Sequence, residues 1–304
     1  MRGQAEPNGT PGAATADSAG RRARLADRES RAARLLRRIG RSKLALVSAI
    51  FLVLVGGSAV CSPLVARYDP EEIDLANRLR GPSLGHWLGT DESGRDYFAR
   101  LVYGGRVSLM VGSVAMTIAV GLGTLGGALA AYFGGWLDAV LMRVADGMLA
   151  IPLFFFVLIA LAVFGPTIAN IVLAIGLTSW MAVARVVRGD VLRTLPLEYV
   201  TAARALGTSM PRLLFRHILP QAVPSIVVAT TLGVAQAILV ESALSYLGLG
   251  VQAPQASWGN MLSNAQSLIF KAPQLAFYPG MMILLTVLAF NSLGDVLRDA
   301  LSPV

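Results

Sequence analysis

Six long apolar segments constrain this chain more than any other feature of its sequence. They lie at about 44–61, 107–133, 139–164, 168–187, 223–247 and 276–293. A helix needs about 20 mainly apolar residues to cross the hydrocarbon core of a bilayer. Helices and closed barrels alone satisfy every backbone polar group in lipid, and barrel strands alternate apolar and polar residues. The unbroken runs therefore predict an all-α membrane protein with six transmembrane helices.

The composition agrees with a bilayer protein. The 304 residues are 55% hydrophobic and 14% charged, whereas a soluble domain has about 25% charged residues. The apolar excess is concentrated in blocks and is not spread along the chain, which argues against a large soluble core.

The basic residues predict the topology. The net charge is +8; eleven of the 26 basic residues lie at or before Lys43, and six lie between Arg185 and Arg216. The loop at 63–105 has five Arg against seven acidic residues, and the loop between the fifth and sixth spans has only Lys271. Because basic loops stay in the cytoplasm, both termini and the loop at 188–222 are expected inside. We therefore attribute the positive net charge to the orientation of the chain in the membrane, and we expect no nucleic-acid partner.

The chain divides into a tail and a transmembrane domain. Residues 1–42 are expected to form a cytoplasmic basic tail, disordered over 1–20. Residues 21–41 combine nine arginines with apolar residues near helical spacing, which predicts an amphipathic helix on the inner leaflet of the bilayer. Residues 43–304 form the transmembrane domain.

Two kinds of chemistry are excluded by missing residues. Neither Lys43 nor Lys271 follows a glycine-rich phosphate loop, so this chain cannot hydrolyse ATP by that route. A zinc site needs several His or Cys ligands, and His86 and His217 are predicted on opposite sides of the membrane. No metal site and no cofactor on this chain are expected.

The second span contains a formal GxGxxG match at 121–126. A dinucleotide site needs a preceding strand and an accessible turn, and here the motif lies in the middle of a predicted span. Gly123 and Gly127 are four residues apart on one helix face, which favours close packing against a neighbouring helix.

Polar groups inside the spans are candidates for a translocation path or gate, because burying them in lipid is costly. Glu241 in the fifth span is the clearest, and either a path-lining role or a hydrogen bond to a neighbouring helix accounts for it. Asp146, near Arg143 in the third span, favours a structural role. Gln236 and Asn291 are weaker candidates for the path. Pro152 interrupts the third span and can kink it.

The loop at 63–105 is expected outside the membrane. Four of its residues are candidates for function: Asp91, Gly94, Arg95 and Asp96. A loop of this length is usually functional or disordered. The following stretch, 97–103, predicts a short surface helix before the second span.

The loop at 188–222 predicts a helical hairpin. Alanines at 202, 203 and 205 favour a helix, and Gly207 suits its C-terminal cap. Ser209 is placed to cap a second helix with Pro211 in its first turn. The hairpin has small residues on one face and basic residues on the other, which suits insertion into a groove on a partner protein.

The same loop resembles the "EAA" signature of bacterial ABC importer permeases. Thr201-Ala202-Ala203 is followed by Gly207 and by Leu219-Pro220 at the spacing of that signature. The chain departs from it at Thr201, where Glu is usual, and at His217, where Ile is usual. The resemblance implies that ten residues couple the chain to an ATPase: Glu198, Thr201, Ala202, Ala203, Arg204, Gly207, Thr208, Pro211, Leu219 and Pro220.

Two further stretches resemble the permeases of the dipeptide, oligopeptide and nickel class, C-type subunit. They are His86–Asp96 with Tyr103–Leu109, and Glu241–Val251 with Ser257–Leu262. The resemblance covers about Lys43 to the C-terminus and implies a type I ABC importer permease fold.

The resemblance also implies partners and a mechanism. The chain would be a non-enzymatic permease subunit in a bacterial cytoplasmic membrane, importing di- or oligopeptides by alternating access. Its partners would be a second related permease, two ATPase domains that carry the ATP and Mg, an extracytoplasmic substrate-binding protein, and the lipid bilayer. A nickel chelate or haem is the alternative substrate, and a stand-alone secondary transporter or channel is the alternative function.

Overall fold

The computed structural model describes residues 42–301. The predicted tail at 1–42 and its amphipathic helix therefore lie outside the described residues, apart from Ser42. The helices are, in chain order, α2 (Lys43–Val60), α3 (Ser62–Val65), η1 (Leu75–Asn77), α4 (Tyr97–Phe133), α5 (Gly135–Leu149), α6 (Leu153–Phe164), α7 (Ile168–Thr194), α8 (Glu198–Ala205), α9 (Met210–Leu213), the π-helical turn η2 (Leu214–Ile218), α10 (Leu219–Tyr246), α11 (Trp258–Gln266) and α12 (Gln274–Leu301). Over this range the regular secondary structure is helical, and the only strand-like pairing is a single bridge between Thr90 and Asp96.

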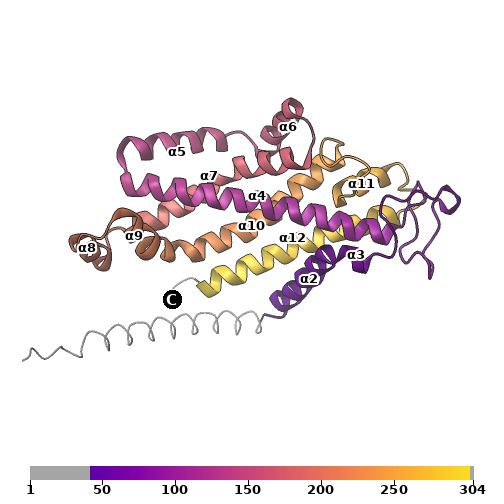
Figure 1. The fold of residues 1–304 in the computed structure, drawn as a ribbon, viewed down its shortest axis with the longest axis horizontal. Coiled ribbons are helices and arrows are strands. Elements are labelled where there is room, and N and C mark those ends of the chain that lie inside the picture. The colour runs from indigo at the N-terminus through magenta and orange to yellow at the C-terminus, as the bar shows by residue number, and fades with distance from the viewer. Residues whose placement is uncertain (1–41, 302–304) are drawn as a thin grey trace, which may run out of the picture.

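Helix α4 lies at the centre of an elongated bundle. It packs against α7 along much of its length, and α10 lies against α4, α7 and α12 (Figure 1). A side-chain carbon at Gly127 would lie 2.3 Å from the carbonyl oxygen of Ala184, and one at Gly123 would lie 2.6 Å from that of Trp180. The predicted close helix packing at these two glycines is thus confirmed, and α7 is the neighbour.

The predicted membrane spans are confirmed at five places, and the third is different. Five helices are long and apolar enough to cross a bilayer: α2, α4, α7, the continuous helix Met210–Tyr246, and α12. In place of a single third helix, α5 and α6 meet at 88° across a short break at 150–152. Counted as one broken span, this pair gives the sixth. Pro152, whose ring cannot continue a helix, lies at the break, so the interruption is sharper than a kink.

Two helix starts differ most from the prediction, and α7 and α12 also end later than expected, at Thr194 and Leu301. Residues 97–103 are not a separate surface helix but the first two turns of α4, which continues for 37 residues. The helix of the fifth span does not begin near Val223, because α9, η2 and α10 follow one another from Met210. In both cases a polar helical stretch joins an apolar one, in the second case through Pro220 and Pro224, and hydropathy alone cannot detect such a continuation.

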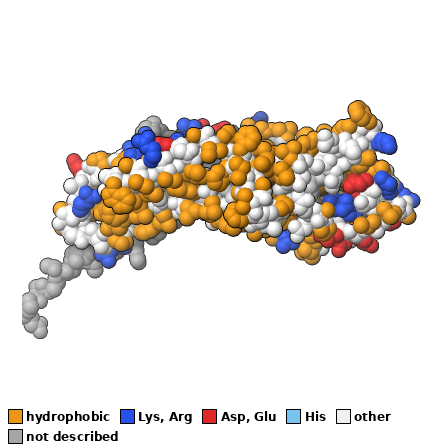
Figure 2. Space-filling view, turned by 90° about the horizontal axis from the view of Figure 1, so that it is seen from above, with side chains coloured by type: hydrophobic (Ala, Val, Ile, Leu, Met, Phe, Trp, Pro, Cys, Tyr) orange, Lys and Arg blue, Asp and Glu red, His pale blue; other side chains and the backbone are white. Residues whose placement is uncertain are grey.

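The surface has the distribution expected in a bilayer. Apolar side chains cover the middle of the elongated body, and charged side chains gather toward its two ends (Figure 2). The loop with α8 and α9 lies at one end of the bundle, and the loop before α4 lies with α11 at the other (Figure 1). These two ends hold the candidate functional residues.

Candidate functional site

The first candidate site is the coupling loop, residues 188–222, at one end of the bundle. Its helix α8 ends in a turn in which the N–H of Gly207 donates to the carbonyl of Arg204 and the N–H of Thr208 donates to that of Ala203, both near 3.0 Å. This paired pattern, with Gly207 at φ +76°, is a Schellman cap. The predicted cap at Gly207 is confirmed. Ser209 lies at the N-cap position of α9, but its side chain makes no capping hydrogen bond.

Buried apolar side chains attach this loop to the bundle. Val200 of α8 has no exposed surface, and Leu213, Leu214 and Ile218 at the start of the next helix are buried beside it in the same core cluster. Leu219, at the first position of α10, is also buried. The hairpin is therefore held firmly at its base although it extends beyond the bundle.

The outer surface of the coupling loop remains open. Thr201, Ala202 and Arg204 are exposed, and the Thr201 hydroxyl donates to the carbonyl of Leu197 at 3.3 Å. The Arg204 guanidinium lies 5.7 Å from the ring centroid of Tyr132 at the end of α4, a cation–π contact. Ala203 alone of the small residues is partly buried, against the core. The other predicted coupling residues, Glu198, Thr208, Pro211 and Pro220, are exposed or partly buried on the same loop.

Sequence reasoning missed the two most exposed large apolar residues of this loop. Leu206, directly before Gly207, is 87% exposed, and Phe215 is 59% exposed. Large apolar side chains in water favour contact with a partner. The available signal was a leucine at the tip of an otherwise small and polar turn.

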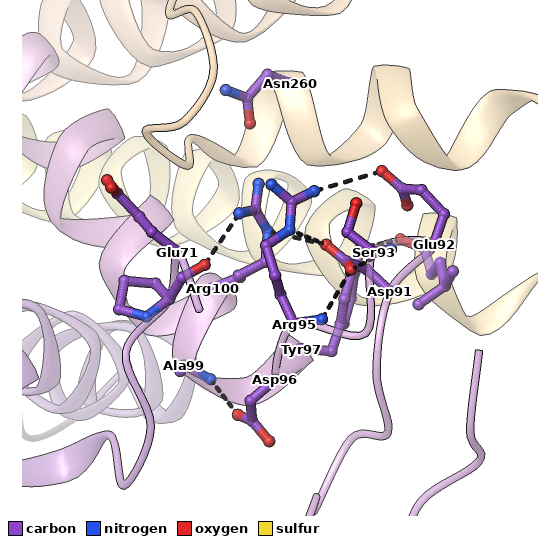
Figure 3. A network of polar contacts seen from close by, with 12 residues as sticks. Glu71, Asp91, Glu92, Ser93, Arg95, Asp96, Tyr97, Ala99, Arg100 and Asn260 are labelled. Atoms are coloured by element: carbon purple, nitrogen blue, oxygen red, sulfur yellow. Dashed lines mark hydrogen bonds and ion pairs between the residues drawn. The ribbon is translucent and has the colours of Figure 1, made fainter. Parts of the chain in front are cut away.

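The second candidate site, the distal cap, comprises residues 66–96 and 247–273 at the opposite end. Its centre is Asp91, 2% exposed, whose carboxylate accepts hydrogen bonds from the N–H groups of Ser93 and Arg95 at 2.8 and 3.0 Å. The Arg95 guanidinium donates to the same carboxylate at 2.7 Å, and that of Arg100 lies 3.4 Å from it. Figure 3 shows both arginines converging on Asp91, and the Arg95 guanidinium also reaches Glu92, at 3.4 Å. Buried charges are stable in such a paired and fully hydrogen-bonded arrangement.

Asp96 and Gly94 fix the backbone around this network. The Asp96 carboxylate caps α4 by accepting the N–H of Ala99 at 2.7 Å, and it pairs with His86 Nδ1 at 2.8 Å. Gly94 has φ +80°, and a side-chain carbon there would lie 1.7 Å from the carbonyl oxygen of Asp74. The structure thus brings all four predicted residues of this loop together. Arg100, nearly fully buried and bonded to the carbonyl of Pro70 at 3.1 Å, is the member that the sequence analysis missed.

The four residues predicted for a path or gate are dispersed. Glu241 on α10 is fully buried, Gln236 on the same helix is exposed, and Asn291 on α12 is partly buried. Asp146 on α5 pairs with Arg185 of α7, and not with the neighbouring Arg143. Among the described residues no hydrogen bond or ion pair joins any two of these four.

Helix α5 is attached to α7 by a second ion pair. Arg188 donates twice to Asp138, at 2.5 and 2.6 Å, and the two side chains are partly exposed. Asp138 and Asp146 are both on α5, so the first half of the broken span is tied to α7 by charge. In residues 42–301 no group of three or more His, Cys, Asp or Glu side chains is arranged to hold a metal ion.

Comparison with known proteins assigns the chain to a family. Residues 123–303 match the family described as binding-protein-dependent transport system inner membrane component. Residues 30–82 match the N-terminal TM domain of oligopeptide transport permease C.

Named relatives match nearly the whole chain. The dipeptide transport system permease protein DppC of Alkalihalophilus pseudofirmus is 42% identical over 267 residues, 88% of each chain. The oligopeptide transport system permease protein OppC of Bacillus subtilis is 42% identical over 262 residues, 86% of each chain. The glutathione transport system permease protein GsiD of Escherichia coli is 42% identical over 268 residues, 88% of each chain.

Solved structures share the fold. The MetNI methionine ABC transporter in an inward-facing conformation aligns with a TM-score of 0.55 at 17% identity, covering 68% of this chain and 98% of that chain. An amino acid ABC transporter with histidines aligns with a TM-score of 0.53 at 21% identity, covering 67% and 94%.

The chain belongs to the family of inner-membrane components of binding-protein-dependent transport systems, as a C-type permease of the dipeptide, oligopeptide and nickel class. It is a multi-pass membrane subunit with the type I ABC importer permease fold, and a transport subunit, not an enzyme.

Proposed function

We propose that this chain is one of two related permeases in an ATP-driven importer of dipeptides or oligopeptides in a bacterial cytoplasmic membrane. The second permease completes the pathway, two ATPase domains carry the ATP and Mg, and a substrate-binding protein delivers the peptide from outside. The coupling loop and both termini face the cytoplasm, and transport proceeds by alternating access.

The coupling loop is the observation that carries this proposal. A capped turn with an exposed leucine at its tip is anchored to the bundle by buried Val200 and Leu213. The coupling loop is thus anchored where it joins the bundle and apolar at its tip. This arrangement suits a groove on a partner and allows force to be transmitted into α10. Since no phosphate loop accompanies either lysine, the partner must supply the ATP.

The proposal of a peptide substrate is based on the relatives of this chain. Those named above are described as permeases for dipeptides, oligopeptides and glutathione, all of them short peptides or peptide-like molecules. A nickel chelate or haem is the second candidate substrate. A stand-alone transporter has less support, because polar residues within the spans do not assemble into a shared site.

The test is uptake of labelled dipeptide, tripeptide, nickel chelate and haem by vesicles containing this chain with its partner permease, ATPases and binding protein. Gly207→Trp places a bulky side chain at the docking turn, while Gly207→Asn tolerates the left-handed backbone and serves as the matched control. We expect the Trp variant to insert and assemble but to lose ATP-dependent peptide uptake, and the Asn variant to retain it. Wild-type uptake by the Trp variant, or uptake without any ATPase, would overturn the proposal.

A further inference from the structure

The motif around Glu241 has no assigned role in the coupling loop or in the Asp91 network. Glu241 lies near the distal end of α10 with 0% of its surface exposed. In residues 42–301 no Arg, Lys or His forms an ion pair with its carboxylate. An unpaired carboxylate at this depth is costly and marks a functional candidate.

Serine hydroxyls surround this carboxylate. The hydroxyl of Ser108 on α4 donates to Glu241 Oε2 at 2.9 Å, and that of Ser245 on α10 donates to Oε1 at 2.7 Å. A third hydroxyl, from Ser242, lies 3.4 Å from Oε2. Both carboxylate oxygens therefore act as acceptors. One side chain thus receives hydrogen bonds from α4 and from α10.

Each of the two closer serines is also an acceptor. The N–H of Trp258, at the start of α11, donates to the Ser108 hydroxyl at 3.3 Å. The N–H of Val251 donates to the Ser245 hydroxyl at 3.0 Å. Two chains of hydrogen bonds, which we call the Glu241 relay, thus run from one carboxylate through one serine each to the backbone of the distal cap.

The cap segment that receives the relay is cross-linked by its own hydrogen bonds. The side chain of Asn260 donates to the carbonyls of Val251 and Gln255 at 3.1 and 2.8 Å, and Ser257 and Asn260 form a capping box. The Trp258 indole donates to the carbonyl of Leu101 on α4 at 3.0 Å. Because of these bonds, we expect a force applied through Val251 and Trp258 to move the segment as a unit.

The other end of α10 is the coupling loop. The helix Met210–Tyr246 runs over 37 residues, through the π-helical turn η2 and past Pro224, and a run of this length is about 55 Å long at the rise of an α-helix. Its first turns contain buried Leu213 and Ile218 beside α8, and its last turns contain Glu241 and Ser245. One helix therefore joins the two candidate sites.

We propose that Glu241 is a positioning residue that ties the distal cap to α10 and α4, so that displacement of the coupling loop is passed along α10 to the segment 247–262. This inference rests on the proposed function, and it assigns to the buried carboxylate a mechanical role in coupling, not a place on the substrate path. Glu241 contacts no substrate in this role; it acts through Ser108 and Ser245.

The first measurement is amide hydrogen exchange of peptides covering 247–262 in the assembled transporter, which requires no substrate. In Glu241→Ala both serine hydroxyls lose their acceptor, and exchange at Val251 and Trp258 should rise about tenfold or more. The control is Thr230→Val, because the Thr230 hydroxyl donates at 2.7 Å to the carbonyl of Ile226 in its own helix. Unchanged exchange at both amides in Glu241→Ala would overturn the relay.

The second measurement separates positioning from folding. Basal ATPase activity of the transporter in lipid nanodiscs is compared with the activity stimulated by the liganded binding protein. We expect Glu241→Ala to keep basal activity within about twofold and to lose about tenfold or more of the stimulation. An equal loss of basal and stimulated activity would show a merely structural role and overturn the proposal, as would full stimulation.

Two further variants sharpen the outcome. Glu241→Gln retains an oxygen acceptor and the side-chain shape, so it should recover at least half of the stimulation lost in Glu241→Ala; no recovery contradicts a hydrogen-bonding role. Ser108→Ala combined with Glu241→Ala should be no worse than Glu241→Ala alone, because both remove the same chain of bonds. If wild-type vesicles import no peptide while exchange responds as expected, the proposed substrate fails and the relay stands.

Discussion

The coupling loop and the distal cap are stabilised by different kinds of interaction. The coupling loop is held by buried apolar side chains at its base, and its tip presents Leu206 to solvent. The distal cap is held by buried charges, with Asp91 joined to Arg95 and Arg100. An apolar knob adapts to a partner's groove, whereas a buried ionic network has one geometry and loses stability when any member is removed. The difference predicts that substitutions in the cap act on folding and substitutions at the loop tip act on assembly.

The largest effect is expected at Gly94. In Gly94→Ala the new carbon must overlap the carbonyl of Asp74 at a left-handed backbone position, and stability should fall by about 3 kcal/mol. The measurement is the thermal unfolding midpoint of the purified complex. Gly81→Ala is the matched control in the same loop, since a side-chain carbon there meets no atom within 4 Å. Equal midpoints for the two variants would contradict the rigid cap.

The next effect is expected at Asp91. Asp91→Asn retains the shape but removes the charge that Arg95 and Arg100 share, and stability should fall by about 2 kcal/mol. The control is Glu72→Gln, an exposed carboxylate of the same loop. Thermal unfolding in detergent at fixed salt compares the two, and a smaller loss for Asp91→Asn than for Glu72→Gln would show that the network carries no stability.

At the tip of the coupling loop, a substitution is expected to weaken assembly with the ATPase and to leave folding stability nearly unchanged. Leu206→Asp changes a side chain that is 87% exposed, so the free energy of unfolding should change by no more than about 0.5 kcal/mol. Affinity for the ATPase, measured by pull-down titration or interferometry, should fall about tenfold. Leu84→Asp, at a leucine 93% exposed in the distal cap, is the control and should leave this affinity unchanged. A similar loss in both variants would remove the distinction between the two ends.

The smallest effect is expected at the two ion pairs that tie α5 to α7. Asp146→Asn breaks an exposed ion pair with Arg185 and should cost less than about 1 kcal/mol. Asp138→Asn breaks the bidentate and less exposed pair with Arg188, and it should cost more than Asp146→Asn. Unfolding at low and at high salt checks the order, because screening weakens the more exposed pair first.

Local patterns in the sequence correctly predicted much of this protein. Apolar runs located the spans because the cost of exposing backbone polar groups to lipid depends on a segment's own length and composition. The turn at Gly207 was predictable because a helix cap is decided within a few residues. The missing phosphate loop and the "EAA" pattern were likewise readable from adjacent positions.

The tertiary structure decided what depends on distant residues. Ser108 and Glu241 are 133 positions apart, and only the packing of α4 against α10 brings the hydroxyl to the carboxylate. The sequence left Glu241 open between a path-lining role and a hydrogen bond to a neighbouring helix; the structure shows that bond. The burial of Val200 also depends on neighbouring helices, which hydropathy does not include. The sequence determined which segments enter the membrane and where the chain turns, because those free energies are local, whereas pairing between helices is fixed only when the whole bundle packs.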